Sequence, residues 1–297
     1  MGLRTSRDRQ AWILLLPLLV IIATVTGYPL INTFRLSFTD ASLTGRNVAQ
    51  HWVGFENYAY VFTDPDFGDA FRRTLYFTFV SVGAEILLGV LVALLLNREF
   101  RGRTAVRALL VLPWALPTIV NAMMWRLIYN PEFGSLNALL LQLGLIDSYQ
   151  SWLGTPGTAM NMVILADVWK NYPLVAIIVL AALQTIPREL YEAASIDGAG
   201  PWTKFWKVTF PAILGPLSVA LVLRMIEAFK VFDIIYLMTR GGPADSTKSV
   251  SFFVYQESFA YLRAGSGAAY ALVVTMASAV LIAMYIMLLR KQDQAAS

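Results

Sequence analysis

Six long apolar runs, separated by polar or glycine- and proline-containing connections, set the pattern of the chain. Each run is long enough to cross the hydrocarbon core of a bilayer as a helix, which takes about 20 residues. The predicted spans cover about residues 11–31, 71–96, 104–129, 158–183, 212–238 and 266–289. The pattern therefore predicts an all-α, polytopic membrane protein with six transmembrane helices in a single domain over residues 1–297.

Two of these runs need a closer interpretation. The first could be taken for a secretory signal peptide, but it is too long and lacks a convincing cleavage site of small residues. We interpret it as an uncleaved first helix. The third contains Pro113 and Pro117, so we expect an interrupted helix, which is tolerated at membrane depth where it lines a cavity or packs on protein.

The composition agrees with a membrane protein. The 297 residues are 57% hydrophobic and 14% charged, whereas soluble domains carry about 25% charged residues. The absence of cysteine excludes disulfides and thiolate metal sites, and the single histidine, His51, excludes a multi-histidine metal cluster. The formal net charge of +4 needs no nucleic acid to explain it.

Six spans place both termini on one side of the membrane, and the basic residues of the connections indicate which side it is. The side of the termini carries Arg4, Arg7, Arg9, Arg98, Arg101, Arg103, Arg107, Arg188, Lys204, Lys207, Arg290 and Lys291. The opposite side carries Arg35, Arg46, Arg72, Arg73, Arg240, Lys248 and Arg263. Because twelve basic residues stand against seven, the positive-inside rule puts the N and C termini and the 185–211 loop in the cytoplasm.

The loop over residues 185–211 combines charge, glycine and several prolines. Pro187 is tolerated in a first helical turn, Gly198 supplies a left-handed residue that ends a helix, and Pro201 can open a second helix. Pro211 restricts the backbone where the fifth span begins. We therefore expect two short helices joined by a sharp turn.

This loop resembles the EAA signature of permease subunits in binding-protein-dependent ABC importers. The matching positions are Glu192, Ala193, Ala194, Gly198, Val208, Phe210 and Pro211. The longer form Glu-Ala-Ala-x-x-Asp-Gly-Ala, which ends at Ala199, resembles the carbohydrate-uptake branch, the class of the maltose importer. The segment Phe229–Pro243, which ends in Gly-Gly-Pro, and Trp169-Lys170 with Pro173 are similar to that branch as well.

The resemblance implies a type I ABC importer permease fold in the bacterial inner membrane. It implies that the loop is a coupling helix that docks on a cytoplasmic ATPase, through Glu192, Ala193, Ala194, Asp197, Gly198 and Ala199. The implied partners are a second, homologous permease (a heterodimer), an ABC ATPase dimer that binds ATP and Mg, and a periplasmic solute-binding protein. No cofactor is expected in this chain.

Charged residues inside the fourth and fifth spans are the second candidate site. The fourth span carries Asp167 and Lys170, and the fifth carries Arg224, Glu227, Lys230 and Asp233. Each costs about 2.5–3.5 kcal/mol at the bilayer centre, so such charges usually face a bundle interior or a wet cavity. On one continuous fifth helix, Leu223, Glu227, Lys230 and Ile234 would share a face.

Two interpretations of these charges remain open at this point. They could form a ladder of ion pairs three residues apart, or they could line a shared translocation cavity. Glu85 in the second span could pair with Arg224 or Arg126.

By analogy with the family, sugar contacts come from the middle of the fourth and fifth spans. Aromatic faces and hydrogen-bonding groups suit a polyhydroxylated ring. The candidates for the substrate pathway are Lys170, Asn171, Tyr172, Glu227, Phe229, Lys230 and Asp233. The basic residues permit an anionic glycoside, but neighbouring acids could simply neutralise them.

Nothing in the sequence indicates catalysis. Residues 242–249 end like a phosphate-binding loop but have Thr247 where the second glycine is required. A single histidine supports no nucleophile–base pair, so we expect no enzyme, and ATP hydrolysis is assigned to a partner subunit. The alternatives are a permease for a non-sugar solute, an ion-coupled secondary transporter that uses Glu85, Asp167 or Asp233, and a membrane scaffold.

Overall fold

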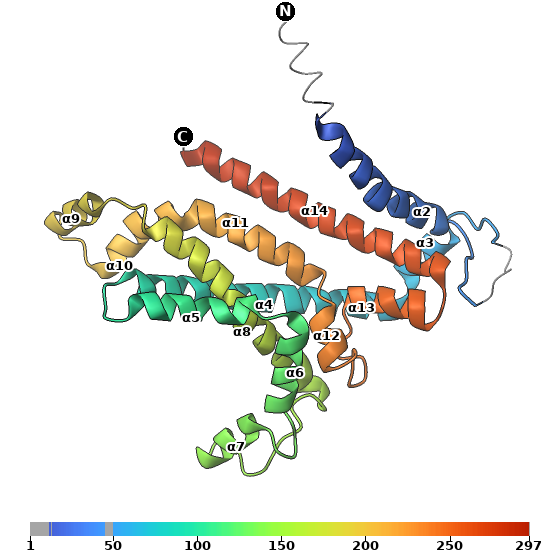
Figure 1. Cartoon of the computed structure of the whole chain (residues 1–297), viewed down its shortest axis with the longest axis horizontal. Coiled ribbons are helices and arrows are strands. Elements are labelled where there is room, and N and C mark those ends of the chain that lie inside the picture. The colour runs from blue at the N-terminus through green and yellow to red at the C-terminus, as the bar shows by residue number, and fades with distance from the viewer. Residues whose placement is uncertain (1–11, 13, 45–49, 297) are drawn as a thin grey trace, which may run out of the picture. The chain divides into compact units, whose positions relative to one another are not determined.

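The computed structural model describes residues 12, 14–44 and 50–296, without the side chains of 285, 286 and 288–296. Arg4, Arg7, Arg9 and Arg46, which entered the orientation argument, lie outside the described residues, as do the side chains of Arg290 and Lys291. The described chain is helical (Figure 1), and its isolated antiparallel bridge joins Thr39 and Trp52.

The helices account for most of the described chain. They are α2 (Tyr28–Leu36), α3 (Glu56–Thr63), α4 (Pro65–Asn97), α5 (Arg103–Ala115), α6 (Thr118–Ile128), α7 (Ser135–Gln142), α8 (Pro156–Leu183), α9 (Arg188–Ile196), α10 (Pro201–Lys204), α11 (Phe210–Phe229), α12 (Asp233–Met238), α13 (Val250–Tyr255) and α14 (Ala264–Ala296). Three π-helical turns, η1 to η3, cover Ala23–Gly27, Phe205–Thr209 and Gln256–Ala260.

The number of membrane spans agrees with the sequence pattern. Among the described residues, five helices are long and apolar enough to cross a bilayer, and six if the bent pair α5–α6 counts as one span. The five are Leu14–Leu36, Pro65–Asn97, Pro156–Leu183, Pro201–Phe229 and Ala264–Met284. The prediction of an all-α, polytopic membrane protein is confirmed.

The third span is interrupted where its prolines predict. α5 ends at Ala115, α6 begins at Thr118, and the two helices are bent by 95° at the break. Pro117 is the residue before α6, where its missing N–H costs no helical hydrogen bond.

The fifth span differs from the prediction. The expected single helix over 212–238 is wrong, because α11 ends at Phe229 and α12 begins only at Asp233. The argument that Glu227 and Lys230 share one helical face with Ile234 therefore fails, since Lys230 already has non-helical dihedral angles. The helix also begins earlier than expected, at Pro201.

The chain divides into two compact units. The smaller comprises Met1–Pro65 and Phe253–Ala277, and the larger comprises Asp66–Phe252 and Ser278–Ser297. The prediction of a single domain over residues 1–297 stays a prediction.

In the smaller unit, hydrogen bonds between side chains and backbone surround the antiparallel bridge between Thr39 and Trp52. Asn57 Nδ2 donates to the carbonyls of Ser37 and Thr39, both at 2.9 Å. Gly265 fits closely beside them, because a Cβ there would lie 2.0 Å from the Thr39 carbonyl oxygen. The backbone N–H of His51 donates to Asp40 Oδ1 at 2.7 Å, and this bond holds the pKa of the Asp40 carboxyl below its ordinary value.

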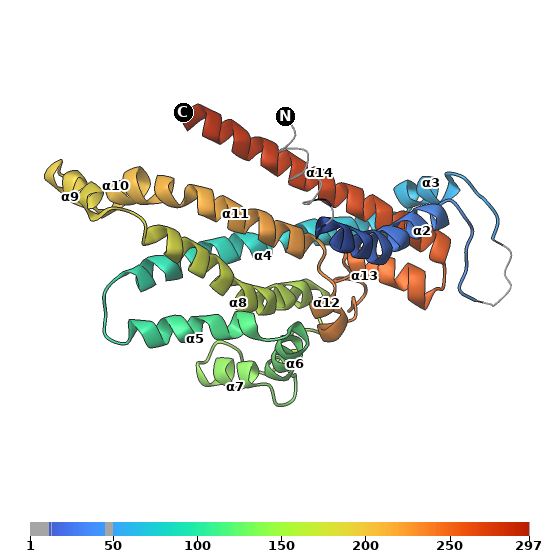
Figure 2. The same cartoon turned by 45° about the horizontal axis from the view of Figure 1, so that its top comes forward.

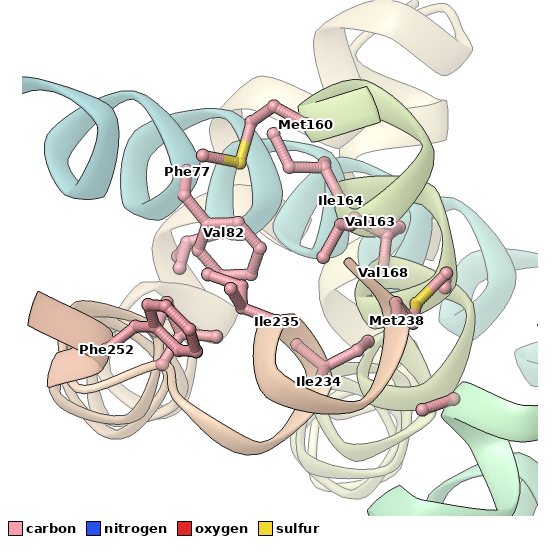
Figure 3. Packing of buried hydrophobic residues seen from close by; sticks show 14 of the residues in the cluster. Phe77, Val82, Met160, Val163, Ile164, Val168, Ile234, Ile235, Met238 and Phe252 are labelled. Atoms are coloured by element: carbon pink, nitrogen blue, oxygen red, sulfur yellow. The ribbon is translucent and has the colours of Figure 1, made fainter. Parts of the chain in front are cut away.

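The larger unit has a hydrophobic core between α4, α8, α12 and α13. Figure 3 shows Phe77 of α4, Ile164 of α8, Ile235 of α12 and Phe252 of α13 gathered in it. A second apolar cluster joins α4, α8 and α11 around Val175. α8 also packs against α5, and α6 packs against α12.

The position of α9 and α10 determines what the loop before the fifth span can contact. Both helices lie at one end of α8 and α11, away from α6, α7 and α12 (Figures 1 and 2). Arg188, the first residue of α9, forms an ion pair at 3.1 Å with Glu99 in the connection between α4 and α5. The α9–α10 region and the break after α11 are therefore at opposite ends of α11.

Candidate functional site

A polar cavity of about 330 Å³ lies in the larger unit, between α4, α6, α8, α11 and the segment that joins α11 to α12. Its ionisable lining residues are Asp167, Lys170, Arg224, Glu227, Lys230 and Asp233. Thr118 and Asn171 add neutral polar groups, and Phe77 and Phe232 add aromatic ones. A second hollow of about 370 Å³ shares Thr118 and Asp233 with it. Both volumes lie in the range of small-molecule pockets, about 300–1,000 Å³.

Arg224 organises the wall of this cavity. It donates to both carboxylate oxygens of Glu85, from Nε at 2.6 Å and from Nη2 at 2.9 Å. Its Nη2 also donates to Asp167 Oδ2 at 3.3 Å, and its Nη1 donates to Glu227. One guanidinium thus joins α4, α8 and α11, which explains how these charges are tolerated inside the span.

Burial varies steeply across this network. Glu85 is 0% exposed and Arg224 is 3% exposed, whereas the Glu227 side chain is 63% exposed and faces the cavity. Asp167 also accepts a hydrogen bond from Asn171 Nδ2 at 2.9 Å. The network therefore runs from a dry interior at Glu85 to a wet surface at Glu227.

The two open interpretations of the charges both hold in part. Arg224 and Glu227 form the expected ion pair three residues apart, and Glu85 pairs with Arg224 rather than with Arg126. Lys170 and Lys230 differ, because neither is within 4.0 Å of a carboxylate oxygen of any described residue. The ladder of pairs ends at Glu227, and both lysines face the cavity.

The break after α11 brings Lys230 and Asp233 to the cavity. A helix that ends inside a membrane span leaves carbonyl groups without partners, and each must be satisfied by protein. The hydroxyl of Ser249 donates to the Val231 carbonyl at 2.8 Å. Asp233 lies in the first turn of α12, where a negative charge is favourable.

The structure brings together five of the seven candidates for the substrate pathway. Lys170, Asn171, Glu227, Lys230 and Asp233 line the cavity. Tyr172 and Phe229 are not among its lining residues, and Phe229 is 1% exposed and packs edge-on to Phe71 at a centroid distance of 6.0 Å. The assignment of the seven to a substrate pathway stays a prediction.

Sequence reasoning missed the contributions of α6 and of the break itself. Thr118 reaches the cavity because the bend before α6 brings its first residue there, and Phe232 does so because it lies in the break. Pro117 could have indicated the position of Thr118, because it marks the break directly before α6. No glycine or proline marked Phe232.

The second candidate site is the elbow, which we define as residues 185–209. α9 begins directly after Pro187, and Gly198 has a φ of 77°, in the left-handed region that favours glycine. α10 begins at Pro201 but is not a separate short helix. It continues through the π-helical turn η2 into α11, and the wider turn accommodates Pro211.

A hollow of about 310 Å³ lies in the elbow, between α9 and the start of the following helix. Four of the residues expected to couple to an ATPase line it, namely Ala194, Asp197, Gly198 and Ala199. Glu192 and Ala193 are exposed on α9 outside this lining. Exposure and a concave surface are what a docking element requires, and the coupling role stays a prediction.

Three contacts hold α9 in place, two of them within the elbow and one to the connection between α4 and α5. Lys204 Nζ donates to Ser195 Oγ at 2.6 Å, and the hydroxyls of Tyr191 and Thr209 bond at 2.9 Å. Arg188 makes the ion pair with Glu99 described above. α9 is thus attached at its first residue to the α4–α5 connection and near its end to Lys204 of α10.

Comparison with known proteins gives consistent matches. Residues 85–294 match the family model described as "Binding-protein-dependent transport system inner membrane component". The trehalose/maltose transport system permease protein MalF of Thermococcus litoralis is 40% identical over 254 residues, covering 85% of this chain and 84% of that protein. The sulfoquinovosyl glycerol transport system permease protein SmoG of Agrobacterium fabrum is 35% identical over 287 residues, covering 96% and 92%.

A solved structure agrees in fold. A crystal structure of a bacterial ABC transporter involved in the import of the acidic polysaccharide alginate superposes with a TM-score of 0.83, covering 96% of each chain. The sequence identity is 24%, so this likeness shows the fold alone.

Proposed function

Because this chain belongs to the inner membrane components of binding-protein-dependent transport systems, we propose that the solute it carries is a sugar, an oligosaccharide or a glycoside. The chain is a multi-pass, non-catalytic permease subunit of an ABC importer in the inner membrane. The family implies a partner ATPase and a periplasmic binding protein.

The relatives support a carbohydrate solute. Two permeases that are 40% and 35% identical, over most of both chains, are named for trehalose/maltose and for sulfoquinovosyl glycerol. The cavity fits such solutes chemically, because it combines hydrogen-bond donors and acceptors with the partly exposed aromatic side chain of Phe232. The single observation that carries the proposal is this polar cavity at the break in the fifth span.

The elbow is the proposed coupling element. Its contact surface comprises Glu192, Ala193, Ala194, Asp197, Gly198 and Ala199. The alanines and Gly198 leave a shallow surface that a partner can approach closely, and α9 is held at both ends, so it can transmit a displacement. A second, homologous permease completes the proposed pore, as a heterodimer.

Reconstitution of the complete importer in liposomes tests the proposed function. Uptake of trehalose, maltose and a sulfonated glycoside is measured with and without ATP and the binding protein. We expect uptake of at least one of them, only when both are present. We expect none from the chain alone under a proton or sodium gradient.

Uptake assays with other solutes distinguish the sugar permease from the alternative functions. Uptake of an amino acid, phosphate or a polyamine in place of every sugar would replace the sugar proposal while leaving the permease in place. Uptake by the chain alone, driven by an ion gradient, would contradict the ATP-dependent mechanism.

A further inference from the structure

Glu85 lies behind the wall of the cavity rather than in it. It is 0% exposed, comes from α4, and is not among the lining residues, whereas its partner Arg224 is. It nevertheless makes a two-pronged pair with the Arg224 guanidinium, at 2.6 and 2.9 Å. A planar guanidinium and a carboxylate that meet in this way fix each other's orientation.

The orientation of Arg224 decides what the cavity presents to a solute. With its Nε and Nη2 on Glu85, the guanidinium lies in the wall and its remaining donors reach Asp167 and Glu227. Three carboxylates surround this one cation. The two positive groups that remain in the lining without an ion pair to a described residue are Lys170 and Lys230.

We infer that Glu85 is a positioning residue for the translocation cavity, one that keeps the Arg224 guanidinium in the wall so that the cavity suits uncharged hydroxyl-bearing solutes rather than anions. This inference rests on the proposed sugar function for its solute class. It assigns the contact with the solute to the exposed lining residues Glu227 and Lys230, and to Glu85 only an indirect role through Arg224.

The charge inventory gives the physical reason. Glu85, Asp167 and Glu227 oppose Arg224, an excess of two negative charges, and Lys170 and Lys230 offset that excess within the lining. Asp233 adds one further negative charge. An anionic solute therefore meets no net attraction. Removal of the Glu85 charge takes away one negative charge and the two-pronged contact that orients Arg224, and so weakens the repulsion of an anion.

Cysteine labelling measures this electrostatic effect without a transported solute. The chain has no cysteine of its own, so Thr118→Cys gives a single thiol at the cavity wall. In the assembled importer, an anionic and a cationic methanethiosulfonate reagent are compared by their rates of reaction. Glu85→Gln should raise the ratio of anionic to cationic rate by roughly threefold or more, because the wall loses one negative charge and Arg224 is then held only by Asp167 and Glu227.

Two further variants keep the test decisive. Glu85→Asp withdraws the carboxylate by one methylene and should give a smaller shift in the same direction; it replaces Glu85→Gln if that variant does not assemble. Glu132→Gln, which removes an exposed carboxylate elsewhere, should leave the ratio unchanged. An unchanged ratio in an assembled Glu85 variant overturns the inference.

Transport supplies the second measurement. In Glu85→Gln, the KM of a neutral sugar should rise by about tenfold or more, the effect of disturbing one charged hydrogen bond, and an anionic glycoside should gain relative to it. A fall in maximal rate with both KM values unchanged would indicate a purely structural role and overturn the inference. Absence of sugar uptake by the unmodified importer would contradict the proposed function instead, and the labelling ratio would still be measured.

Discussion

Lys170, Lys230 and Arg224 are three cations at one cavity, but they are held differently. Arg224 is 3% exposed and has its donors on three carboxylates, which suits a rigid planar fork. The lysine ammonium is a compact point charge on a flexible stem, and Lys230 is exposed in the break of the span. We expect Arg224 to act as structure and the lysines to act on the solute.

Replacement of Lys230 tests this division at the level of one side chain. Lys230→Ala should raise the KM for the sugar by about tenfold, the loss of one charged hydrogen bond, while the amount of assembled importer stays the same. Uptake kinetics in proteoliposomes and the yield of purified complex measure the two quantities.

Lys230→Arg and Lys230→Met are the matched controls for that substitution. The first keeps the charge and should keep most of the affinity, and the second keeps the apolar stem and should behave like alanine. Loss of assembly in Lys230→Met with an unchanged KM would mean that this lysine is structural.

Helix crossings set how closely the elements of the larger unit approach each other. α4 meets α8 at Gly89, where an added Cβ would lie 2.6 Å from the Val175 side chain. Small residues are common at such crossings, since packing rather than the hydrophobic effect holds helices together in lipid. Gly83, six residues earlier on the same helix, has nothing within 4 Å of the position of its missing Cβ.

The two glycines give a matched pair of substitutions. Gly89→Ala should lower the unfolding free energy by about 1–3 kcal/mol, because the overpacked methyl displaces α8. Gly83→Ala should leave it unchanged or raise it by up to about 1 kcal/mol through helix propensity. Thermal unfolding of the detergent-solubilised importer compares them, and equal melting temperatures would rule out the close crossing.

At the scale of the whole importer, the proposed coupling role requires the elbow to transmit force while its turn at Gly198 keeps its shape. Gly198 has a φ of 77°, whereas Gly200 has a φ of −71°, which any residue can adopt. A substitution at Gly198 strains the turn by about 1–2 kcal/mol and shifts α9, and Glu192→Lys reverses a charge on its exposed surface.

Gly198→Val and Glu192→Lys should therefore separate ATP hydrolysis from transport. We expect stimulation of the ATPase by the loaded binding protein to be lost, while membrane insertion is retained. Gly200→Ala should behave as the unmodified protein, because nothing lies within 4 Å of its missing Cβ. Normal coupled uptake by both Gly198→Val and Glu192→Lys would exclude the docking role of the elbow.

How much of this molecule could be predicted from sequence depends on how far apart along the chain the interacting residues lie. Hydropathy placed the spans, because a helix satisfies its own backbone inside a bilayer, and Pro117 marked the break before α6. No proline or glycine in the sequence indicates the break after Phe229. Its Val231 carbonyl is satisfied by the hydroxyl of Ser249, a tertiary contact that no local pattern reveals.

The two candidate sites also differ in this way: local residues determine one, and contacts between distant residues determine the other. In the elbow, both ends of α9 could be predicted, since they depend on the local residues Pro187 and Gly198. The prediction of a second, separate short helix was wrong, because α10 continues through η2 into α11. In the cavity, the sequence left Arg224 and Arg126 open as partners of Glu85, and Arg224 is 139 residues away. The contribution of Thr118 depended on the direction in which α6 leaves its bend.

The unbroken helix from Pro201 to Phe229 has a mechanical consequence. It leaves the elbow at one end and carries Arg224 and Glu227 near the other. From Pro201 to Arg224 its length is roughly 35 Å at the usual rise per residue, so a tilt of about 5° moves the far end by about 3 Å. A continuous helix of this kind would carry a displacement caused by the partner ATPase directly to the polar cavity, without an intervening loop.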